Sequence, residues 1–242
     1  MDKKMFCFQC EQTVGCTGCT GNAGVCGKKA DTAKLQDELT GALISLAKAA
    51  DSTETISKRT GQIIIEGLFT TVTNVSFDNA AIENMIQKVR AEKKRLAPDC
   101  RTKEYDLQQL WNANEDIRSL KSLILFGIRG MAAYAYHANV LNYEDAEVNQ
   151  FFCEALSKIG YEENTEALLS TVLKTGEINL KCMALLDKAN TETYGTPEPT
   201  DVTLTVEKGP FIVVTGHDLK DLQLLLEQTE GKGINIYTHG EM

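Results

Sequence analysis

Five of the eight cysteines lie between Cys7 and Cys26, in the stretch CFQCEQTVGCTGCTGNAGVC. This stretch has no regular helix or strand pattern, so the partners of its thiols must determine how it folds. Three kinds of structure use so many thiols so close together: a disulfide knot, a zinc site and an iron-sulfur cluster. The choice among them constrains the N-terminal fold more than any other feature of the sequence.

The composition argues against a disulfide knot. With 43% hydrophobic and 7% aromatic residues, a chain of 242 residues can bury a core of one or two domains without covalent staples. The opening MDKKMF is not followed by the apolar run and small-residue cleavage site of a signal peptide, so we expect a cytoplasmic protein. In a reducing cytosol, clustered thiols are more often metal ligands or redox centres than disulfides.

The charge pattern bears on the class of partner. The net charge is -9 and no basic stripe is present, which argues against binding to nucleic acid or to an anionic membrane. The longest apolar runs, such as residues 63–65 and 212–214, are far too short to cross a bilayer. We therefore expect neither nucleic acid nor a membrane as a partner.

The spacing of the thiols favours iron over zinc. Cys7 and Cys10 form a C-x-x-C pair, and two further ligands must come from Cys16, Cys19 and Cys26. Zinc would most simply use Cys7, Cys10, Cys16 and Cys19, but only five residues separate these two pairs, fewer than is typical of a zinc ribbon or finger. The wider set Cys7, Cys10, Cys19 and Cys26 suits a glycine-rich loop around a four-iron cluster. The residues alone leave both metals open.

Helical periodicity dominates the next part of the chain. Asp31 and Thr32 offer N-caps for a helix to about residue 50. Further helices are predicted over residues 55–72, 78–95, 117–135, 143–156, 165–174 and 177–188, with a polar connection over 100–114. The sequence thus predicts a mainly α protein in which two helical bundles follow the cysteine-rich loop.

The pattern changes at residues 193–210, which hold three of the four prolines. Beyond them, FIVVTG predicts a buried strand, DLKDLQLLLEQTEG a capped helix ending at Gly231, and INIYTHG a second strand. This is the beginning of a Rossmann-like α/β domain with a parallel sheet. We expect three parts: an iron-sulfur loop at 1–30, a helical domain at 31–194 and a truncated α/β domain at 195–242.

Two metal-ligating side chains follow the predicted strands. His217 comes after the first strand and Glu241 after the second, and the carboxyl ends of parallel strands share one edge of a sheet. From the pattern alone, the more ordinary interpretation is a histidine at a helix N-terminus and a solvated glutamate near the chain end. Two donors also leave a metal centre incomplete, and the chain ends one residue after Glu241.

Several segments together resemble the N-terminal part of the hybrid-cluster protein family, also called prismane proteins or hydroxylamine reductases. They are MFCFQCEQT, GVCGK, NEDIRSLK, ANTETYG, GHDLKDLQLLLEQTEG and YTHGEM, and they span essentially the whole chain. The resemblance implies a helical first domain with an N-terminal 4Fe-4S cluster, followed by α/β domains around a hybrid 4Fe-2O-2S cluster. It also implies reduction of hydroxylamine to ammonia, with an unidentified redox donor.

The resemblance assigns ligands residue by residue. It implies Cys7, Cys10, Cys19 and Cys26 as ligands of the N-terminal cluster, and His217 and Glu241 as two ligands of the hybrid cluster. Cys16 matches no ligand position. The family continues for several hundred residues that supply four further cysteines and another glutamate, so we expect the hybrid cluster only in a full-length chain with the missing C-terminal portion. No residue of this chain is assigned a catalytic role.

Other interpretations remain at this stage. A 2Fe-2S cluster is the alternative to the 4Fe-4S cluster, because the gap between Cys19 and Cys26 is one residue longer than in some relatives with the larger cluster. The chain could be a stand-alone iron-sulfur electron-transfer module without catalysis, or a zinc-stabilised structural domain. Cys100, Cys153 and Cys182 lie in or beside helical patterns, and we expect them to be buried or inert.

Overall fold

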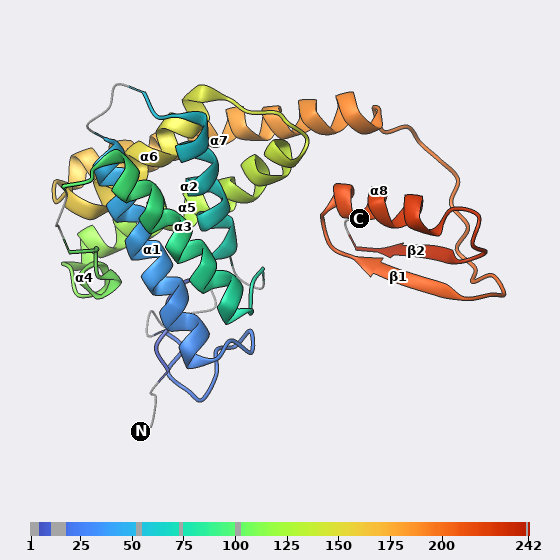
Figure 1. Cartoon of the computed structure of the whole chain (residues 1–242), viewed down its shortest axis with the longest axis horizontal. Helices are drawn as coiled ribbons and strands as arrows, with labels where there is room; N and C mark the ends of the chain where they lie inside the picture. The colour runs from blue at the N-terminus through green and yellow to red at the C-terminus, as the bar shows by residue number, and fades with distance from the viewer. Residues whose placement is uncertain (1–4, 11–17, 52–54, 73–74, 100–102, 241) are drawn as a thin grey trace.

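The computed structural model describes residues 5–10, 18–51, 55–72, 75–99, 103–240 and 242. A helical part carries the N-terminal loop, and a small α/β unit follows it after an extended segment (Figure 1). The helices are α1 (Ala30–Ala50), α2 (Lys58–Thr70), α3 (Asn79–Leu96), α4 (Leu107–Trp111), α5 (Glu115–Val140), α6 (Ala146–Tyr161), α7 (Thr165–Tyr194) and α8 (Leu219–Thr229). The strands are β1 (Phe211–Thr215) and β2 (Asn235–His239). The mainly helical fold with a parallel sheet near its C-terminal end is as predicted.

Side-chain caps begin most of the helices. The carboxylate of Asp78 accepts hydrogen bonds from the amides of Ala80 and Ala81 and so begins α3 where the sequence predicts it. The predicted caps of α1 were wrong, because α1 begins at Ala30 and its N-cap is Lys29, which makes no side-chain cap bond. The Thr32 hydroxyl instead donates to Asn79 Oδ1 at 2.7 Å, and this hydrogen bond links α1 to α3.

Two further predictions about the helices were wrong. The sequence predicted separate helices before and after Gly176, but α7 is continuous through this residue. A glycine costs a helix only about 1 kcal/mol, and the neighbouring Thr175 and Ile178 are buried in the face that packs on α5. Packing therefore outweighs the local preference. The second difference is α4, which lies in the predicted polar connection and buries Leu107 and Leu110.

The helical part has a continuous hydrophobic core. Helix α1 packs against α2, α3 and α6, and α5 packs against α2 and α7, so one cluster of buried side chains includes residues from α1 through α7. Gly41 allows a particularly close approach within it, because a Cβ there would lie 2.1 Å from the carbonyl oxygen of Tyr105. The amide of Tyr105 donates to Ser45 Oγ at 3.0 Å, which holds this segment against α1.

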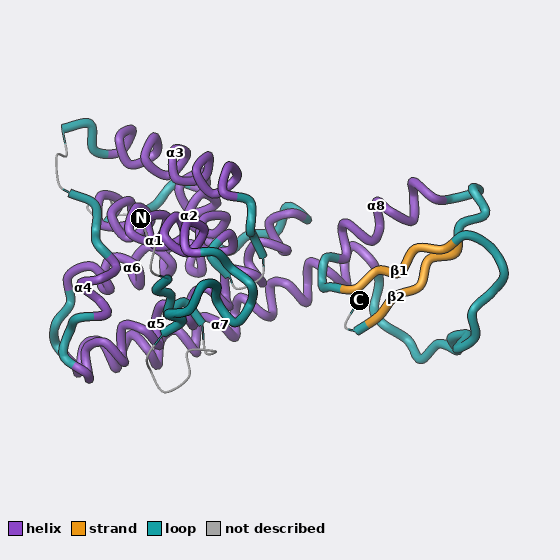
Figure 2. The backbone as a smooth tube through the Cα atoms, turned by 90° about the horizontal axis from the view of Figure 1, so that it is seen from below, coloured by secondary structure: helices purple, strands orange, loops and turns teal. Residues whose placement is uncertain are grey.

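The α/β unit has two parallel strands and one helix, as predicted (Figure 2). Phe211 pairs with Asn235 and Thr215 with His239 at the two ends of the ladder. Asp218 is the N-cap of helix α8, and its carboxylate accepts from the Asp221 amide. The helix ends at Thr229 rather than at Gly231.

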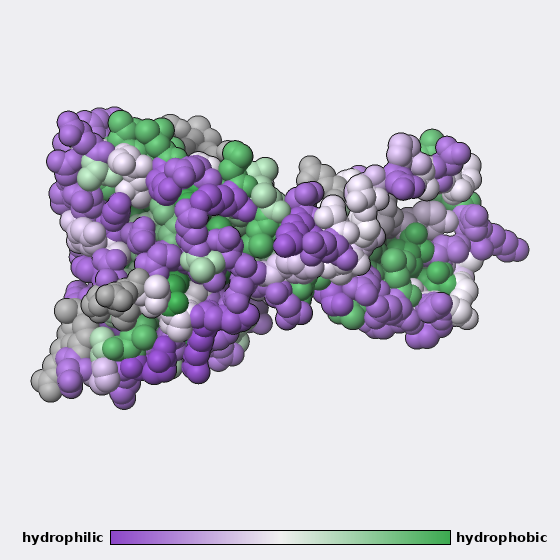
Figure 3. Space-filling view, turned by 90° about the horizontal axis from the view of Figure 1, so that it is seen from above, coloured by the Kyte–Doolittle hydropathy of each residue, from purple (hydrophilic) through white to green (hydrophobic). Residues whose placement is uncertain are grey.

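The prediction that the first strand is buried was wrong. Phe211 is 57% exposed and Val213 is 59% exposed, and α8 has no buried residue. The hydrophobic side chains of this unit accordingly reach the molecular surface (Figure 3). The reason is that parallel strands are normally covered on both faces, whereas this two-stranded sheet is accompanied by a single helix. The division of the chain into domains stays a prediction.

No helix among the described residues is both long and apolar enough to span a bilayer.

Candidate metal centre

The two halves of the cysteine-rich loop meet at Cys7 and Cys19. These residues form an isolated antiparallel bridge, in which the amide of Cys7 donates to the carbonyl of Cys19 at 3.1 Å and the amide of Cys19 donates to that of Cys7 at 2.7 Å. Gly18 leads into the bridge with φ +78, and a Cβ there would lie 3.0 Å from Phe6 Cε2. A left-handed residue in so narrow a space must be glycine. The backbone thus brings two predicted ligands side by side.

A tight turn places the last cysteine of the loop. The amide of Gly24 donates to the carbonyl of Lys28 at 2.8 Å, and the amide of Gly27 donates to that of Gly24 at 2.9 Å. A Cβ on Gly24 would lie 3.5 Å from Cys26 Sγ and 3.5 Å from Met5 Cε. Any larger side chain at this position would therefore enter the space beside the Cys26 thiol.

All four predicted cluster ligands line one small cavity. Its lining residues are Met5, Cys7, Cys10, Cys19, Gly24, Val25, Cys26 and Lys28. Cys7 is buried, and the structure places Cys10, Cys19 and Cys26 at intermediate exposure. Thiolates are the soft ligands that iron-sulfur clusters and zinc prefer, and the described part of the lining contains no carboxylate or imidazole. Cys16, which the zinc alternative requires, lies outside the described residues.

The number and type of donors around the cavity suit an iron-sulfur cluster. A four-iron cluster binds each of four cysteines at a separate iron, and four cysteines line this cavity. Zinc also accepts four thiolates, with each ligand atom at about 2.0–2.3 Å from one ion. The donor set by itself therefore accommodates either metal group.

Behind the cavity lies a buried polar network centred on Gln9. Lys28 Nζ donates to Gln9 Oε1 at 3.0 Å, and Gln9 Nε2 donates to Asp37 Oδ1 at 2.5 Å and to the carbonyl of Ala33 at 3.2 Å. Arg129 Nη1 donates to the backbone carbonyl of Gln9 at 3.3 Å. Gln9 lies between Cys7 and Cys10 in the sequence, so the network holds the peptide that joins the first two predicted ligands.

Burial shifts the proton affinities in this region. Loss of solvation raises the pKa of the Cys7 thiol, and it raises the pKa of Asp37 to about 6 against the opposing hydrogen bond from Gln9. Loss of solvation also lowers the pKa of Arg129 to about 10, although nearby Asp37 favours the charged guanidinium. Arg129 therefore stays charged at neutral pH.

Sequence reasoning missed Gln9, Lys28, Asp37 and Arg129. A signal for one of them was present, because Arg129 is an isolated charge among Leu125, Ile128 and Ala132 on an otherwise apolar helix face. A charged residue in such a position is buried only when it finds partners. Gln9 and Lys28 lie in or beside the cysteine-rich stretch and Asp37 lies in α1, and no pattern sets any of these three residues apart.

An aromatic cluster supports the other side of the loop. Trp111 packs against Phe6 and Phe8, with ring centroids 5.1 Å and 4.6 Å away, and the Arg118 guanidinium lies 5.2 Å from the Trp111 ring. Trp111 is therefore a packing residue of this cluster. Because Phe6 and Phe8 flank Cys7, this packing also ties α4 to the segment that carries the first predicted ligand.

The predicted hybrid-cluster ligands lie elsewhere. His217 is exposed and lines a hollow with Phe69, His137 and Tyr194, separate from the cysteine cavity. Glu241 lies outside the described residues, so whether it approaches His217 stays a prediction. His239 Nδ1 is 3.4 Å from Thr215 Oγ1, across the ends of the two strands.

The isolated cysteines are buried, as expected. Cys153 Sγ donates to the carbonyl of Ala47 at 3.5 Å, and Cys182 Sγ donates to that of Met131 at 3.5 Å. Burial raises the pKa of both thiols to about 12. Neither has the depressed pKa of a reactive thiol. Cys100 lies outside the described residues.

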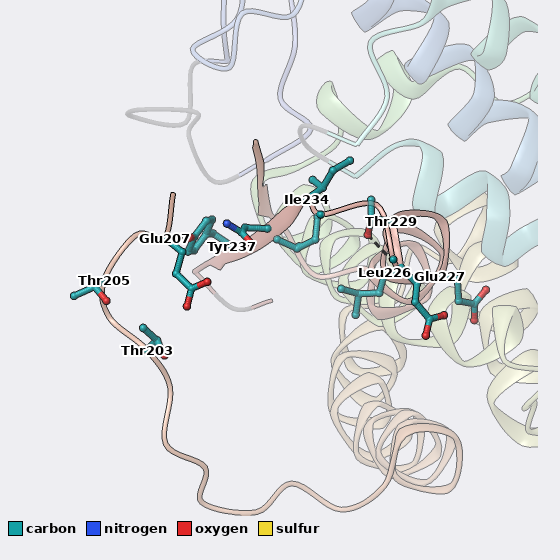
Figure 4. Close-up of a pocket in the computed structure, with 13 residues that line it drawn as sticks. Thr203, Thr205, Glu207, Leu226, Glu227, Thr229, Ile234 and Tyr237 are labelled. Carbon is teal, nitrogen blue, oxygen red and sulfur yellow. Dashed lines mark hydrogen bonds between the residues drawn. The ribbon is translucent and has the colours of Figure 1, made fainter. Parts of the chain in front are cut away.

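A larger hollow lies on the α/β unit, between the segment before β1 and the ends of α8 and β2 (Figure 4). The backbone amide of Glu207 donates to the Tyr237 hydroxyl at 2.8 Å beside it. Among the described residues that line it there is no cysteine or histidine, so none of Cys7, Cys10, Cys19, Cys26 and His217 belongs to this hollow.

Comparison with known proteins places the chain in a family. The model of the Prismane/CO dehydrogenase family matches residues 5–242. The chain belongs to this family. Prismane relatives named hydroxylamine reductase match nearly the whole chain: the protein of Thermodesulfovibrio yellowstonii is 46% identical over 269 residues and that of Clostridium perfringens 41% over 268, each covering 98% of this chain. The protein of Porphyromonas gingivalis is 42% identical over 270 residues and covers 100% of it.

This prismane-family chain is short by comparison. The match covers 49% of the length of each of these three relatives, so the chain spans about half of the curated relatives it matches.

Proposed function

We propose that the chain binds a 4Fe-4S cluster through Cys7, Cys10, Cys19 and Cys26. The observation that carries this proposal is that these four cysteines, from both halves of the N-terminal loop, line one cavity. Membership of the prismane family supports it. The Cys7–Cys19 bridge and the network around Gln9 hold the loop in place, and buried Met5 and Phe8 limit the access of water from the side of the bundle.

We further propose that the chain is the N-terminal part of an oxidoreductase that reduces hydroxylamine to ammonia. The name shared by the relatives supports this reaction. His217 and Glu241 would contribute two of the ligands of a hybrid 4Fe-2O-2S cluster, and the remaining ligands would come from the missing portion. When bound, such clusters supply electrons and iron sites open to substrate. The division into a loop at 1–30, helices at 31–194 and an α/β domain at 195–242 is part of this proposal.

A second function is an iron-sulfur electron-transfer module without catalysis. The exposed position of His217, in a hollow separate from the four cysteines, favours it for the chain by itself. Two hybrid-cluster ligands are too few to retain a multi-iron group, because metal affinity falls steeply when most ligands are absent. We therefore expect this chain alone to hold one cluster and to lack hydroxylamine reduction.

The cluster is tested by metal analysis after anaerobic purification. We expect about four iron atoms per chain and little zinc, with the visible absorption of a 4Fe-4S cluster. Replacing Cys7, Cys10, Cys19 or Cys26 by Ser should lower the bound iron, whereas Cys16→Ser, Cys153→Ser and Cys182→Ser should keep it. Stoichiometric zinc without iron would instead favour the structural alternative. Equal loss of iron in Cys16→Ser would overturn the ligand assignment.

The catalytic proposal is tested by hydroxylamine turnover with reduced methyl viologen as the electron donor. The 242-residue chain should show no activity above free iron, and a chain extended by the C-terminal half of a relative should show activity that His217→Ala abolishes. Robust turnover by the short chain would contradict the need for the missing portion. An active extended chain unaffected by His217→Ala would contradict the role of His217.

A further inference from the structure

Two buried cations lie beside the cysteine cavity. Lys28 lines the cavity itself and is 2% exposed, and Arg129 reaches toward the loop from α5 and is 3% exposed. Lysine and arginine are almost never buried to this degree without a specific partner. Among the described residues, neither cation has a carboxylate within 4.0 Å. Their direct contacts are with uncharged oxygen atoms.

Both cations contact Gln9. Lys28 Nζ donates to the Gln9 side-chain oxygen at 3.0 Å, and Arg129 Nη1 donates to the Gln9 backbone carbonyl at 3.3 Å. Arg129 is further held by Thr40 Oγ1 at 2.8 Å and Thr71 Oγ1 at 3.1 Å. Three helices therefore fix the guanidinium against the peptide that links Cys7 to Cys10.

The charges in this network do not cancel. Asp37 carries the negative charge, and it reaches the cations only through the Gln9 amide, which donates to it at 2.5 Å. Two cations and one carboxylate leave a net positive charge within this hydrogen-bonded network of described residues at neutral pH, with Asp106 acting on Asp37 from outside it. Electrostatic interactions between buried groups are stronger and less screened by salt than those at the surface.

A net positive charge beside an iron-sulfur cluster favours its reduced form. Reduction adds one electron, and so one unit of negative charge, to a group that four thiolates already make negative. The net charge around a cluster, the hydrogen bonds to it and its exposure to solvent together set its reduction potential. We propose that Lys28 and Arg129, both held by Gln9, raise the reduction potential of the cluster bound in the N-terminal loop.

This inference rests on the proposed cluster and assigns the two residues a positioning and electrostatic role. A purely structural role is the alternative, in which Lys28 and Arg129 only hold the loop against α1 and α5. Loss of such a role would lower the iron content or the thermal stability, but it would leave the potential of the remaining cluster unchanged. The reduction potential therefore separates the two roles.

The experiment is a potentiometric titration of the anaerobically purified chain, followed by the electron paramagnetic resonance of the reduced cluster. Lys28→Gln and Arg129→Gln should each lower the ratio of reduced to oxidised cluster about tenfold at a fixed applied potential. For one electron this corresponds to a reduction potential that is lower by about 59 mV. Lys29→Gln removes the same charge from an exposed neighbour and should change the ratio less than about twofold. Lys28→Arg and Arg129→Lys, which keep the charge, should stay close to the wild type.

The substitution Asp37→Asn should shift the reduction potential in the opposite direction from Lys28→Gln and Arg129→Gln. It removes the negative charge of the network and keeps an oxygen that can accept from Gln9, so the ratio of reduced to oxidised cluster should rise. Asp37→Asn also tests the proposed effect of charge on the reduction potential if Lys28→Gln and Arg129→Gln fail to bind iron. The inference is overturned if Asp37→Asn, with its iron intact, titrates like the wild type, or if Lys28→Gln and Arg129→Gln shift no more than Lys29→Gln.

Failure of the proposed cluster is distinguishable from failure of this inference. A wild-type chain that binds no iron after purification and reconstitution contradicts the proposed function, and the inference with it. A wild-type chain that holds four iron atoms, but whose potential does not respond to any of these charges, contradicts the inference alone.

Discussion

Arg129 Nη1 donates a hydrogen bond to the carbonyl oxygen of Gln9 at 3.3 Å, although 120 residues separate the two in the chain. The same guanidinium contacts Thr40 of α1 and Thr71 at the end of α2. One side chain thus fastens the first half of the cysteine-rich loop to three helices. This half of the loop is held by contacts with the helices. Residues 20–27 of the second half are mostly exposed.

Removing iron should therefore loosen the two halves of the loop unequally. Phe8 and Gln9 are 3% and 4% exposed, whereas Val25 is 70% exposed. After anaerobic chelation, amide hydrogen exchange should accelerate over residues 20–27 and stay slow over residues 8–10 and α1, because the metal is a main support of the exposed half. Unchanged exchange at 20–27, in a chain shown to have lost its iron, would contradict this prediction.

Cys153 and Cys182 should resist alkylation in the folded protein. Burial raises the pKa of each thiol to about 12, so the reactive thiolate is scarce at pH 8 and access is blocked as well. After chelation, iodoacetamide at pH 8 should label cysteines of the N-terminal loop first, as mapped by mass spectrometry. Both buried thiols should react after denaturation in urea, which serves as the control. Early labelling of Cys153 or Cys182 would show that the core opens at these positions.

Gly41→Ala should destabilise the helical part. The added Cβ would lie 2.1 Å from the Tyr105 carbonyl oxygen, so the segment that leads into α4 must move. We expect a loss of about 1–3 kcal/mol in the free energy of unfolding, measured by urea denaturation. Gly176→Ala is the matched control, because its Cβ would meet nothing within 4 Å, and it should stabilise α7 by about 0.5–1 kcal/mol. Equal changes in the free energy of unfolding for Gly41→Ala and Gly176→Ala would contradict the close contact between Gly41 and Tyr105.

Glu92→Gln should destabilise the protein at neutral pH. The Glu92 side chain is fully covered in α3, where it accepts from Thr60 Oγ1 at 2.7 Å and pairs with Arg95 at 2.7 Å and Arg59 at 3.1 Å. The hydrogen bond from Arg95 is the largest cause that holds the pKa of Glu92 below its usual value. Loss of the charge should cost about 1.5–3 kcal/mol in the free energy of unfolding at pH 7.

The pH dependence of this effect has a definite sign. A carboxylate with a lowered pKa in the folded state contributes stability that is complete above its unfolded pKa of about 4.5 and is lost as the pH falls through the folded value. The difference in unfolding free energy between wild type and Glu92→Gln should therefore be constant from pH 6 to 8 and shrink below about pH 4.5. A difference that persists unchanged at pH 3 would point to packing rather than charge.

Much of the fold followed from short-range patterns. Asp78 and Asp218 begin their helices as side-chain caps, and alternation of apolar runs with turn residues predicted β1 and β2 in parallel. The uneven spacing of Cys7, Cys10, Cys19 and Cys26 predicted four thiols around one site, and they line one cavity. The helix caps depend on residues within a few positions of one another, and the strands and the cysteines belong to single short segments, so the sequence by itself indicated them.

Only the tertiary structure decided the rest. Packing on α5 carries α7 through Gly176 against its local preference, and the lack of further covering elements leaves β1 exposed despite its apolar sequence. The arrangement of charges behind the cysteine cavity also results from tertiary packing. Neither the burial of Lys28 nor the contact of Arg129 with Gln9 has a local signal of its own, because both arise when α5 closes against the loop and brings residues 120 positions apart within hydrogen-bonding distance. A periodic pattern predicts which face of a helix is buried, but the partner of a lone buried charge depends on where the rest of the chain comes to lie.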